Sequence, residues 1–149
     1  MKKLFFNQKV LLTCIFMTTA MYCSAQKQLL SYQDLQYIIQ SNTAAVTGFL
    51  QQKDYHLQSA DNKQARFFAL FADEDYNDFD LSIQGKHATL TLLTTDLQQI
   101  ETLENSLKNY VYKSTKNGKT YRIKSDAISV ISIKPPAEAQ KVYTVLVEN

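Results

Sequence analysis

The sequence predicts an α+β fold: one antiparallel sheet with two main helices packed on one face. Two observations lead to this prediction. Apolar residues recur at helical spacing in two segments, 32–52 and 97–111, as in amphipathic helices. Short strand-like runs follow each segment, joined by turns too short for the crossover of about a dozen residues that parallel strands need. Hairpins with helices on one side are therefore expected.

The first half begins with the helical segment 32–52, for which Ser31 is the expected N-cap. Polar residues interrupt the apolar pattern at 41–43, so the segment is either one amphipathic helix or two short ones. An acidic loop at 73–77 and a turn at 84–87 separate the later runs. Four strands are expected here, at 55–59, 65–71, 79–83 and 88–94.

The second half begins with Asp96 as the expected N-cap and Gln99 three residues later, the spacing of a capping box. Apolar residues then continue at helical spacing from Leu97 to Val111. The pair Asn117-Gly118 is a good hairpin signal. Four strands are expected to follow the helix, at 110–113, 120–123, 128–133 and 142–147.

The pattern of one helical segment and four strands occurs twice, which predicts half-repeats at 31–95 and 96–149. Leu50/Tyr55 in the first half are matched by Leu107/Tyr112 at the same spacing in the second. We interpret this as a possible ancient duplication. The layout resembles β-lactamase-inhibitory-protein-like folds, tandem helix-plus-sheet binding proteins whose sheets form a broad concave surface. The resemblance covers architecture alone and transfers no functional residue.

Residues 1–25 have the pattern of a cleaved signal peptide. Lysines precede an apolar stretch, and small residues at Ser24-Ala25 precede Gln26. The stretch is shorter than the roughly 20 apolar residues of a membrane span, so no span is expected after cleavage between Ala25 and Gln26. This ending resembles exported proteins of Bacteroidota. A periplasmic or secreted location is predicted; the minor alternative is a lipoprotein acylated at Cys23, although bulky Tyr22 precedes it.

The mature chain, 26–149, has a length typical of a single domain. Both cysteines lie in the leader, so the domain has neither a disulfide nor a thiol nucleophile. Without the three leader lysines, 13 basic side chains remain against 14 acidic ones. Residues 26–95 carry 5 basic and 8 acidic side chains, and residues 96–149 carry 8 and 6. Such a balance argues against a nucleic-acid partner.

Motifs for metal or catalytic chemistry are incomplete. Asp73, Asp75 and Asn77 match the first ligand positions of a calcium loop, but the required glycine and glutamate are replaced by Asp78 and Gln84. The two histidines have no metal-binding spacing. The sequence also lacks a Gly-x-Ser-x-Gly elbow and a glycine-rich phosphate loop. We therefore expect no cofactor, no metal and no enzyme.

The aromatic content favours a binding role. The mature chain has eight tyrosines and five phenylalanines, and tyrosine is enriched at interfaces. In the 65–71 run, Phe68 and Leu70 are expected to point away from the helices. We expect an exported module that binds a protein, peptide or envelope component through its exposed sheet face, as a monomer or homodimer. Phe68, Leu70, Arg122 and Tyr143 are the candidate contacts. The alternatives are a small periplasmic hydrolase with a dispersed site and a self-assembling envelope protein.

Overall fold

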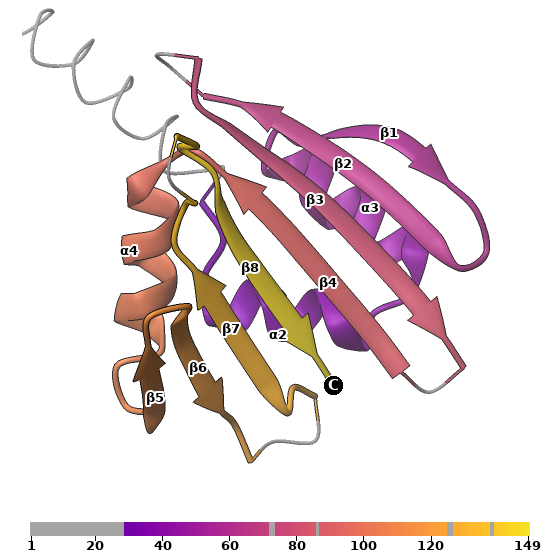
Figure 1. Ribbon diagram of the computed structural model, residues 1–149. Helices are drawn as coiled ribbons and strands as arrows, with labels where there is room; N and C mark the ends of the chain where they lie inside the picture. Colours follow the sequence, from indigo (N-terminus) through magenta and orange to yellow (C-terminus); the bar gives the residue numbers. More distant parts are fainter. Residues whose placement is uncertain (1–28, 72–73, 86, 125–126, 138) are drawn as a thin grey trace, which may run out of the picture.

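The computed structural model describes residues 29–149 apart from 72–73, 86, 125–126 and 138. The strands in this part of the chain form one antiparallel sheet in the order β1-β2-β3-β4-β8-β7-β6-β5 (Figure 1). This confirms the predicted α+β fold. The helices are α2 (Tyr32–Gln40), α3 (Thr43–Gln52) and α4 (Leu97–Ser106), and the strands are β1 (His56–Ala60), β2 (Gln64–Leu70), β3 (Tyr76–Gln84), β4 (His87–Thr94), β5 (Tyr112–Thr115), β6 (Gly118–Arg122), β7 (Val130–Lys134) and β8 (Tyr143–Glu148).

The sheet consists of two meanders that meet in its centre. β1 to β4 form one meander and β5 to β8 the other, and they are joined by antiparallel pairing of β4 with β8, which places Leu92 opposite Val145. We call these the first half-sheet (β1–β4) and the second half-sheet (β5–β8). The match between Leu50/Tyr55 and Leu107/Tyr112 in the sequence does not extend to burial, because Tyr55 is buried whereas Tyr112 is 51% exposed. The duplication itself stays a prediction.

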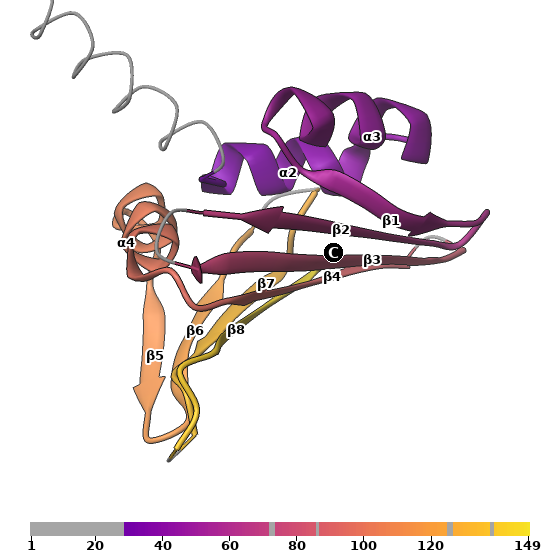
Figure 2. The ribbon, with the colours of Figure 1, turned by 90° about the horizontal axis from the view of Figure 1, so that it is seen from above.

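All three helices lie on the same side of the sheet. Figure 2 shows the sheet bent, with α2 and α3 above the first half-sheet, α4 outside the bend and the other face on its inner side. The helix-covered face carries the core, in which alternate residues of each strand are buried. The core side chains of the sheet include Phe67, Phe79, Leu90, Leu92, Val145 and Val147. Within the described residues, no helix has both the length and the apolar character needed to cross a bilayer.

Two short helices form in 32–52 because each has its own N-cap. Ser31 Oγ accepts a hydrogen bond from the backbone N–H of Asp34, and the Asp34 carboxylate accepts one from Ser31 N–H at 2.7 Å, completing a capping box. Ser41 is extended, and Asn42 Oδ1 accepts from Ala45 N–H at 2.9 Å to begin α3. Asn42 therefore interrupts the helical segment by bonding locally to the backbone.

The expectations for α4 are confirmed at its start and wrong at its end. Asp96 is the N-cap, and its carboxylate accepts from Gln98 N–H at 2.7 Å. Gln99 does not complete a capping box, because its side chain points into the core. The helix ends at Ser106, and Val111, expected to continue the apolar stripe, is 86% exposed.

A buried polar cluster fastens the start of the described chain to α4 and β3. The Gln99 amide donates to Leu30 C=O at 2.7 Å and accepts from Leu30 N–H at 2.9 Å. It also accepts from Asn77 Nδ2 at 3.0 Å, and Asn77 Nδ2 in turn contacts Tyr55 Oη. All four residues are buried. Burial raises the pKa of the Tyr55 hydroxyl far above its usual value, which keeps this group neutral.

Candidate functional site

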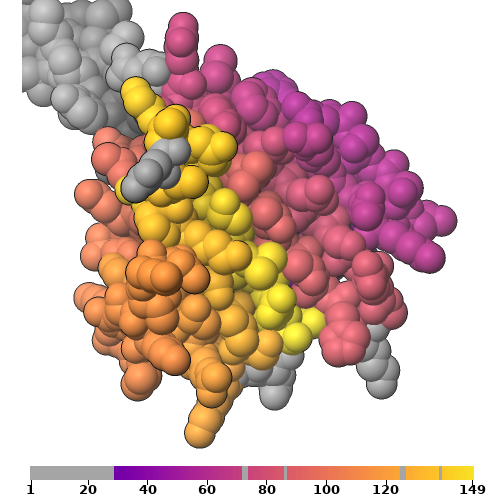
Figure 3. Space-filling view, viewed as in Figure 1, coloured from indigo at the N-terminus to yellow at the C-terminus, as the bar shows by residue number. Residues whose placement is uncertain are grey.

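The candidate site is the sheet face that none of the helices α2, α3 and α4 covers. Figure 3 looks onto this face, and atoms of β4 and β8 (salmon and yellow) are visible across its middle. Phe68 and Leu70 lie on it, because they alternate along β2 with the buried residues Phe67 and Ala69. The expected orientation of Phe68 and Leu70 is thus confirmed. Their binding role stays a prediction. We call this the open face.

An apolar cluster lies on the open face at one end of the first half-sheet. Phe68 stacks on Tyr76 of β3, with ring centroids 5.8 Å apart and an interplanar angle of 24°. Leu70 lies opposite Tyr76 in the strand register and is 59% exposed. Leu93 of β4 lies in the same row as Phe68, two strands away, with Asp78 of β3 between them. We call Phe68, Leu70, Tyr76 and Leu93 the apolar cluster.

The sequence interpretation missed two members of this cluster. Tyr76 was assigned to the acidic loop, but β3 begins at Tyr76, so its ring lies on the open face of the sheet, against Phe68. Leu93 follows Thr89 and Thr91 at the same alternation, and this spacing placed it on the outward side of β4. The alternation was therefore an available signal for Leu93, whereas the ring position of Tyr76 depended on where the strand began.

An ion pair borders the cluster within the first half-sheet. Arg66 Nε donates to Asp78 Oδ1 at 3.0 Å, and Arg66 Nη2 contacts the second carboxylate oxygen. Asp78 raises the pKa of the Arg66 guanidinium through this hydrogen bond and its charge. Asp80, directly opposite Arg66 in the register, is exposed on the same face. The charge of Arg66 is therefore already matched within the chain.

The other two predicted contact residues lie in different places. Arg122 of β6 is exposed on the open face, opposite Val130 of β7. Tyr143 is not on this face: it shares the alternation of the buried residues Val145 and Val147 and packs partly against the core. The structure thus brings Phe68 and Leu70 together, places Arg122 on the second half-sheet, and puts Tyr143 on the helix side.

Tyr143 instead lines a cavity of about 240 Å³ between α4 and the second half-sheet. Lys119 and Glu104 form an ion pair of 2.7 Å among its lining residues, and the hydrogen bond that Lys119 Nζ donates to Glu104 raises the pKa of Lys119. Ile100 and Ile133 contribute apolar surface. Both charged groups neutralise one another, so the cavity presents a small mixed surface rather than a free acid or base.

Asn77, one of the calcium-loop candidates, does not face the acidic loop. Asn77 is fully buried and its amide bonds to Tyr55 and Gln99, so it points away from the loop. Asp73 lies outside the described residues, and Asp75 precedes the start of β3. Across the described part of the chain, no three His, Cys, Asp or Glu side chains are grouped so as to hold a metal ion. Asn77 does not act as a loop ligand because it belongs to β3, where its side chain faces the core.

The two histidines lie at opposite ends of the sheet. His56 is opposite Phe68, which is opposite Asp78 of β3. His87 is opposite Gln84, six residues further along β3. At about 3.4 Å per residue, the two imidazoles are roughly 20 Å apart along the strand direction. They do not share a site.

The arrangement on the open face is suited to recognition by contact. It combines exposed apolar and aromatic area at Leu70, Phe68 and Tyr76 with charged and polar side chains on the neighbouring strands, a mixture also found in protein interfaces. Comparisons with models of known protein families, with characterised proteins and with solved structures return no match.

Proposed function

We propose that the mature chain is an exported, non-catalytic binding module that holds a protein partner on the open face of its sheet. The apolar cluster is the observation that supports this proposal. Leu70 and the Phe68–Tyr76 stack expose apolar surface on a face that no helix within the described residues covers. Fully burying a leucine side chain contributes about 1.5–3 kcal/mol, so a partner that buries the apolar cluster would form a more stable complex.

The shape of the sheet also supports a partner of polypeptide size. The open face is on the inner side of the bend between the two half-sheets (Figure 2), so an occupant can contact both at once. The leader at 1–25 supports the export part of the proposal, with a periplasmic or secreted location, or the lipoprotein alternative through Cys23. Within this scheme the cavity beside Tyr143 has no assigned role.

The test uses two leucines of nearly equal exposure on opposite sides of the molecule. Leu70 is 59% exposed on the open face, and Leu97 is 57% exposed at the start of α4. Tagged protein 26–149 would be incubated with an envelope extract of its own cells, and captured proteins would be identified by mass spectrometry. We expect a captured partner to bind Leu70→Ala about tenfold more weakly and Leu97→Ala unchanged, since tenfold corresponds to about 1.4 kcal/mol.

Three outcomes would decide between this proposal and its alternatives. If Leu70→Ala and Leu97→Ala captured the partner equally well, the open face would not be the binding surface. If the chain captured only itself, and light scattering showed a mass rising with concentration that Leu70→Ala abolished, self-assembly would replace a foreign partner. If profiling on ester, peptide and glycoside substrates gave turnover, a hydrolase would replace the binding module. Circular dichroism of each variant would confirm that it remains folded.

A further inference from the structure

The charges on the open face are divided unequally between the half-sheets. The first half-sheet carries Arg66, Asp78 and Asp80, a small negative excess. The second carries three cations, Lys113 of β5, Arg122 of β6 and Lys134 of β7, which the register places on the same face as Phe68. Glu148 of β8 is the acidic side chain on that part of the face.

The three cations differ from Arg66 in lacking a matched acid. Arg66 is held by Asp78, whereas Lys113, Arg122 and Lys134 are exposed and have no carboxylate within 4.0 Å among the residues described. Glu148 is two strands away from Arg122, with Val130 between them. Two strand spacings are about 9.5 Å, so Glu148 weakens the local positive potential without pairing with Arg122.

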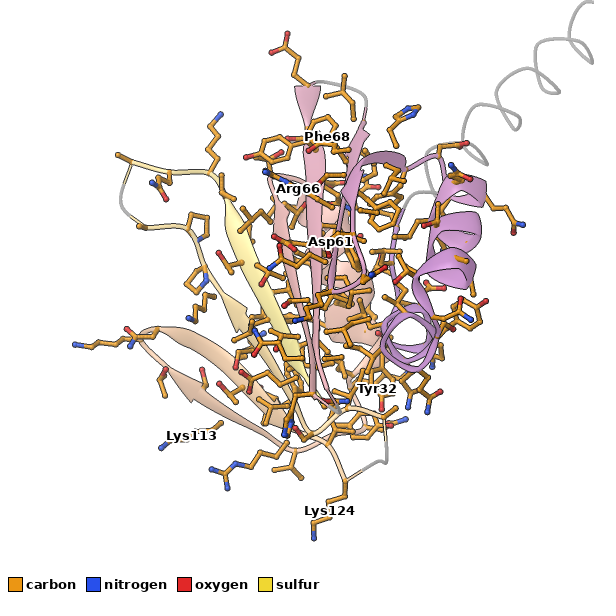
Figure 4. The ribbon with its side chains drawn as sticks, turned by 90° about the vertical axis from the view of Figure 1, so that its right-hand side faces the viewer. Tyr32, Asp61, Arg66, Phe68, Lys113 and Lys124 are labelled. Atoms are coloured by element: carbon orange, nitrogen blue, oxygen red, sulfur yellow. The ribbon has the colours of Figure 1, made fainter. Side chains whose placement is uncertain are left out.

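The positions of these groups define a pattern that an occupant would have to match. One row of the open face runs from Phe68 through Asp78, Leu93 and Thr144 to Lys134. Four strand spacings separate its ends, about 19 Å along the sheet. An extended chain advances about 3.4 Å per residue, so a segment of about six residues reaches from Phe68 to Lys134, and a longer one is needed to reach Arg122 on the next strand. Figure 4 shows the two parts, with Arg66 and Phe68 on β2 and Lys113 on the left, away from the helices.

We infer that the occupant of the open face is a polypeptide segment with apolar side chains over the apolar cluster and acidic side chains facing Lys113, Arg122 and Lys134. This inference rests on the proposed function and names the chemistry of its partner. Complementary charge across an interface fixes orientation and speeds association. A second copy of this chain fits less well, because its first half-sheet has only a small negative excess, with Asp78 already paired to Arg66, and so offers few free acids to three cations. A bilayer surface also fits poorly, because a flat layer cannot follow the inside of a bend.

The probe is a blocked decapeptide with Leu-Phe at one end, Gly and Ser in the middle and four Glu at the other end. Two counterparts carry Gln or Lys in place of Glu. Dissociation constants would be measured by fluorescence anisotropy at about 50 mM salt, where exposed charges are weakly screened. We expect the Glu peptide to bind about tenfold more tightly than the Gln peptide, the Lys peptide to bind most weakly, and the differences to shrink at about 0.5 M salt.

Two variants with the same change in net charge separate local from overall charge. Arg122→Glu changes the open face, and Lys108→Glu changes an exposed lysine directly after α4. We expect Arg122→Glu to abolish the preference for Glu over Gln, and Lys108→Glu to preserve it. Equal losses in both variants would show that only net charge matters and would overturn the inference.

The remaining outcomes distinguish this inference from the proposed function. If Leu70→Ala weakened all three peptides while the wild type showed no preference for Glu, the open face would bind polypeptide and the charge argument would be wrong. If no peptide bound the wild type, this pattern of partner would be excluded, and the capture experiment alone would decide the proposed function. If vesicles of phosphatidylcholine and phosphatidylglycerol bound in an Arg122-dependent manner and the Glu peptide did not, the cations would recognise lipid headgroups instead.

Discussion

Replacing Gln99 by alanine is expected to be among the most damaging single changes outside the apolar core. The Gln99 amide is fully buried and makes three hydrogen bonds, two with the backbone of Leu30 and one with the Asn77 side chain. Its removal leaves the Leu30 N–H, the Leu30 C=O and an Asn77 N–H without that partner. Each buried polar group left unsatisfied costs about 1–3 kcal/mol.

The sum of these costs is lowered by any water that enters the space left by the side chain, so we expect a loss of about 3–5 kcal/mol. That is a large part of the roughly 5–15 kcal/mol by which a domain of this size is stable. Urea unfolding of protein 26–149, followed by circular dichroism, would measure it. With a slope near 2 kcal/mol per molar, the midpoint should fall by about 2 M.

Gln98→Ala is the matched control for this measurement. Gln98 is the adjacent residue of α4, and its side chain is exposed. An exposed substitution of this kind is expected to change the free energy of unfolding by less than about 0.5 kcal/mol. If Gln99→Ala behaved like Gln98→Ala, the buried amide would not be fastening Leu30 to α4, and the reasoning would be refuted.

Three further predictions concern pH and glycine. Because the pKa of Tyr55 is raised in the folded protein, the unfolded chain loses the hydroxyl proton at a lower pH than the folded one. The free energy of unfolding should therefore fall above about pH 10, by up to about 1.4 kcal/mol per pH unit. Urea titrations at pH 9 to 12 should show a shallower fall in the free energy of unfolding for Tyr55→Phe, and parallel curves for the two proteins would contradict this. Gly118→Ala should cost about 3 kcal/mol or more, because φ is +118° and a Cβ would lie 2.1 Å from Ile133 O, whereas Gly85→Ala, with φ +65° and free space, should cost about 1 kcal/mol. Equal thermal midpoints for these two variants would disprove the close approach. Gly48→Ala lies in α3 with no atom within 4 Å of the added Cβ, so it should stabilise the protein by about 0.5–1 kcal/mol in the same thermal assay.

The open face was predictable where alternation was regular and unpredictable where strand boundaries mattered. The orientation of Phe68 and Leu70 followed from their alternation with Phe67 in β2. Asn77 was grouped with the acidic loop because the strand was expected to begin at 79, whereas β3 begins at Tyr76. A shift of three residues in this boundary decided whether the Asn77 side chain was a surface ligand or a buried hydrogen-bond donor.

Tyr143 was wrongly predicted to lie on the open face, against the alternation of side chains along its strand. Its alternation with Val145 and Val147 was visible in the sequence, and the structure places all three on the helix-covered face. Tyrosine is common both at interfaces and at the margins of cores, since its ring is apolar and its hydroxyl is polar. Residue type favoured the open face, whereas strand parity favoured the core, and the structure agrees with parity.

The sequence by itself determined the α+β class, the antiparallel pairing, most of the elements and the caps at Ser31 and Asp96, because these depend on local periodicity and on contacts within a few residues. Only the tertiary structure decided that Gln99 bonds to Leu30, 69 residues away, and that β4 pairs with β8 to bend the two half-sheets around one open face. Both features require segments far apart in the chain to meet. Their free energy is released when the core forms, and no local pattern of residues encodes it.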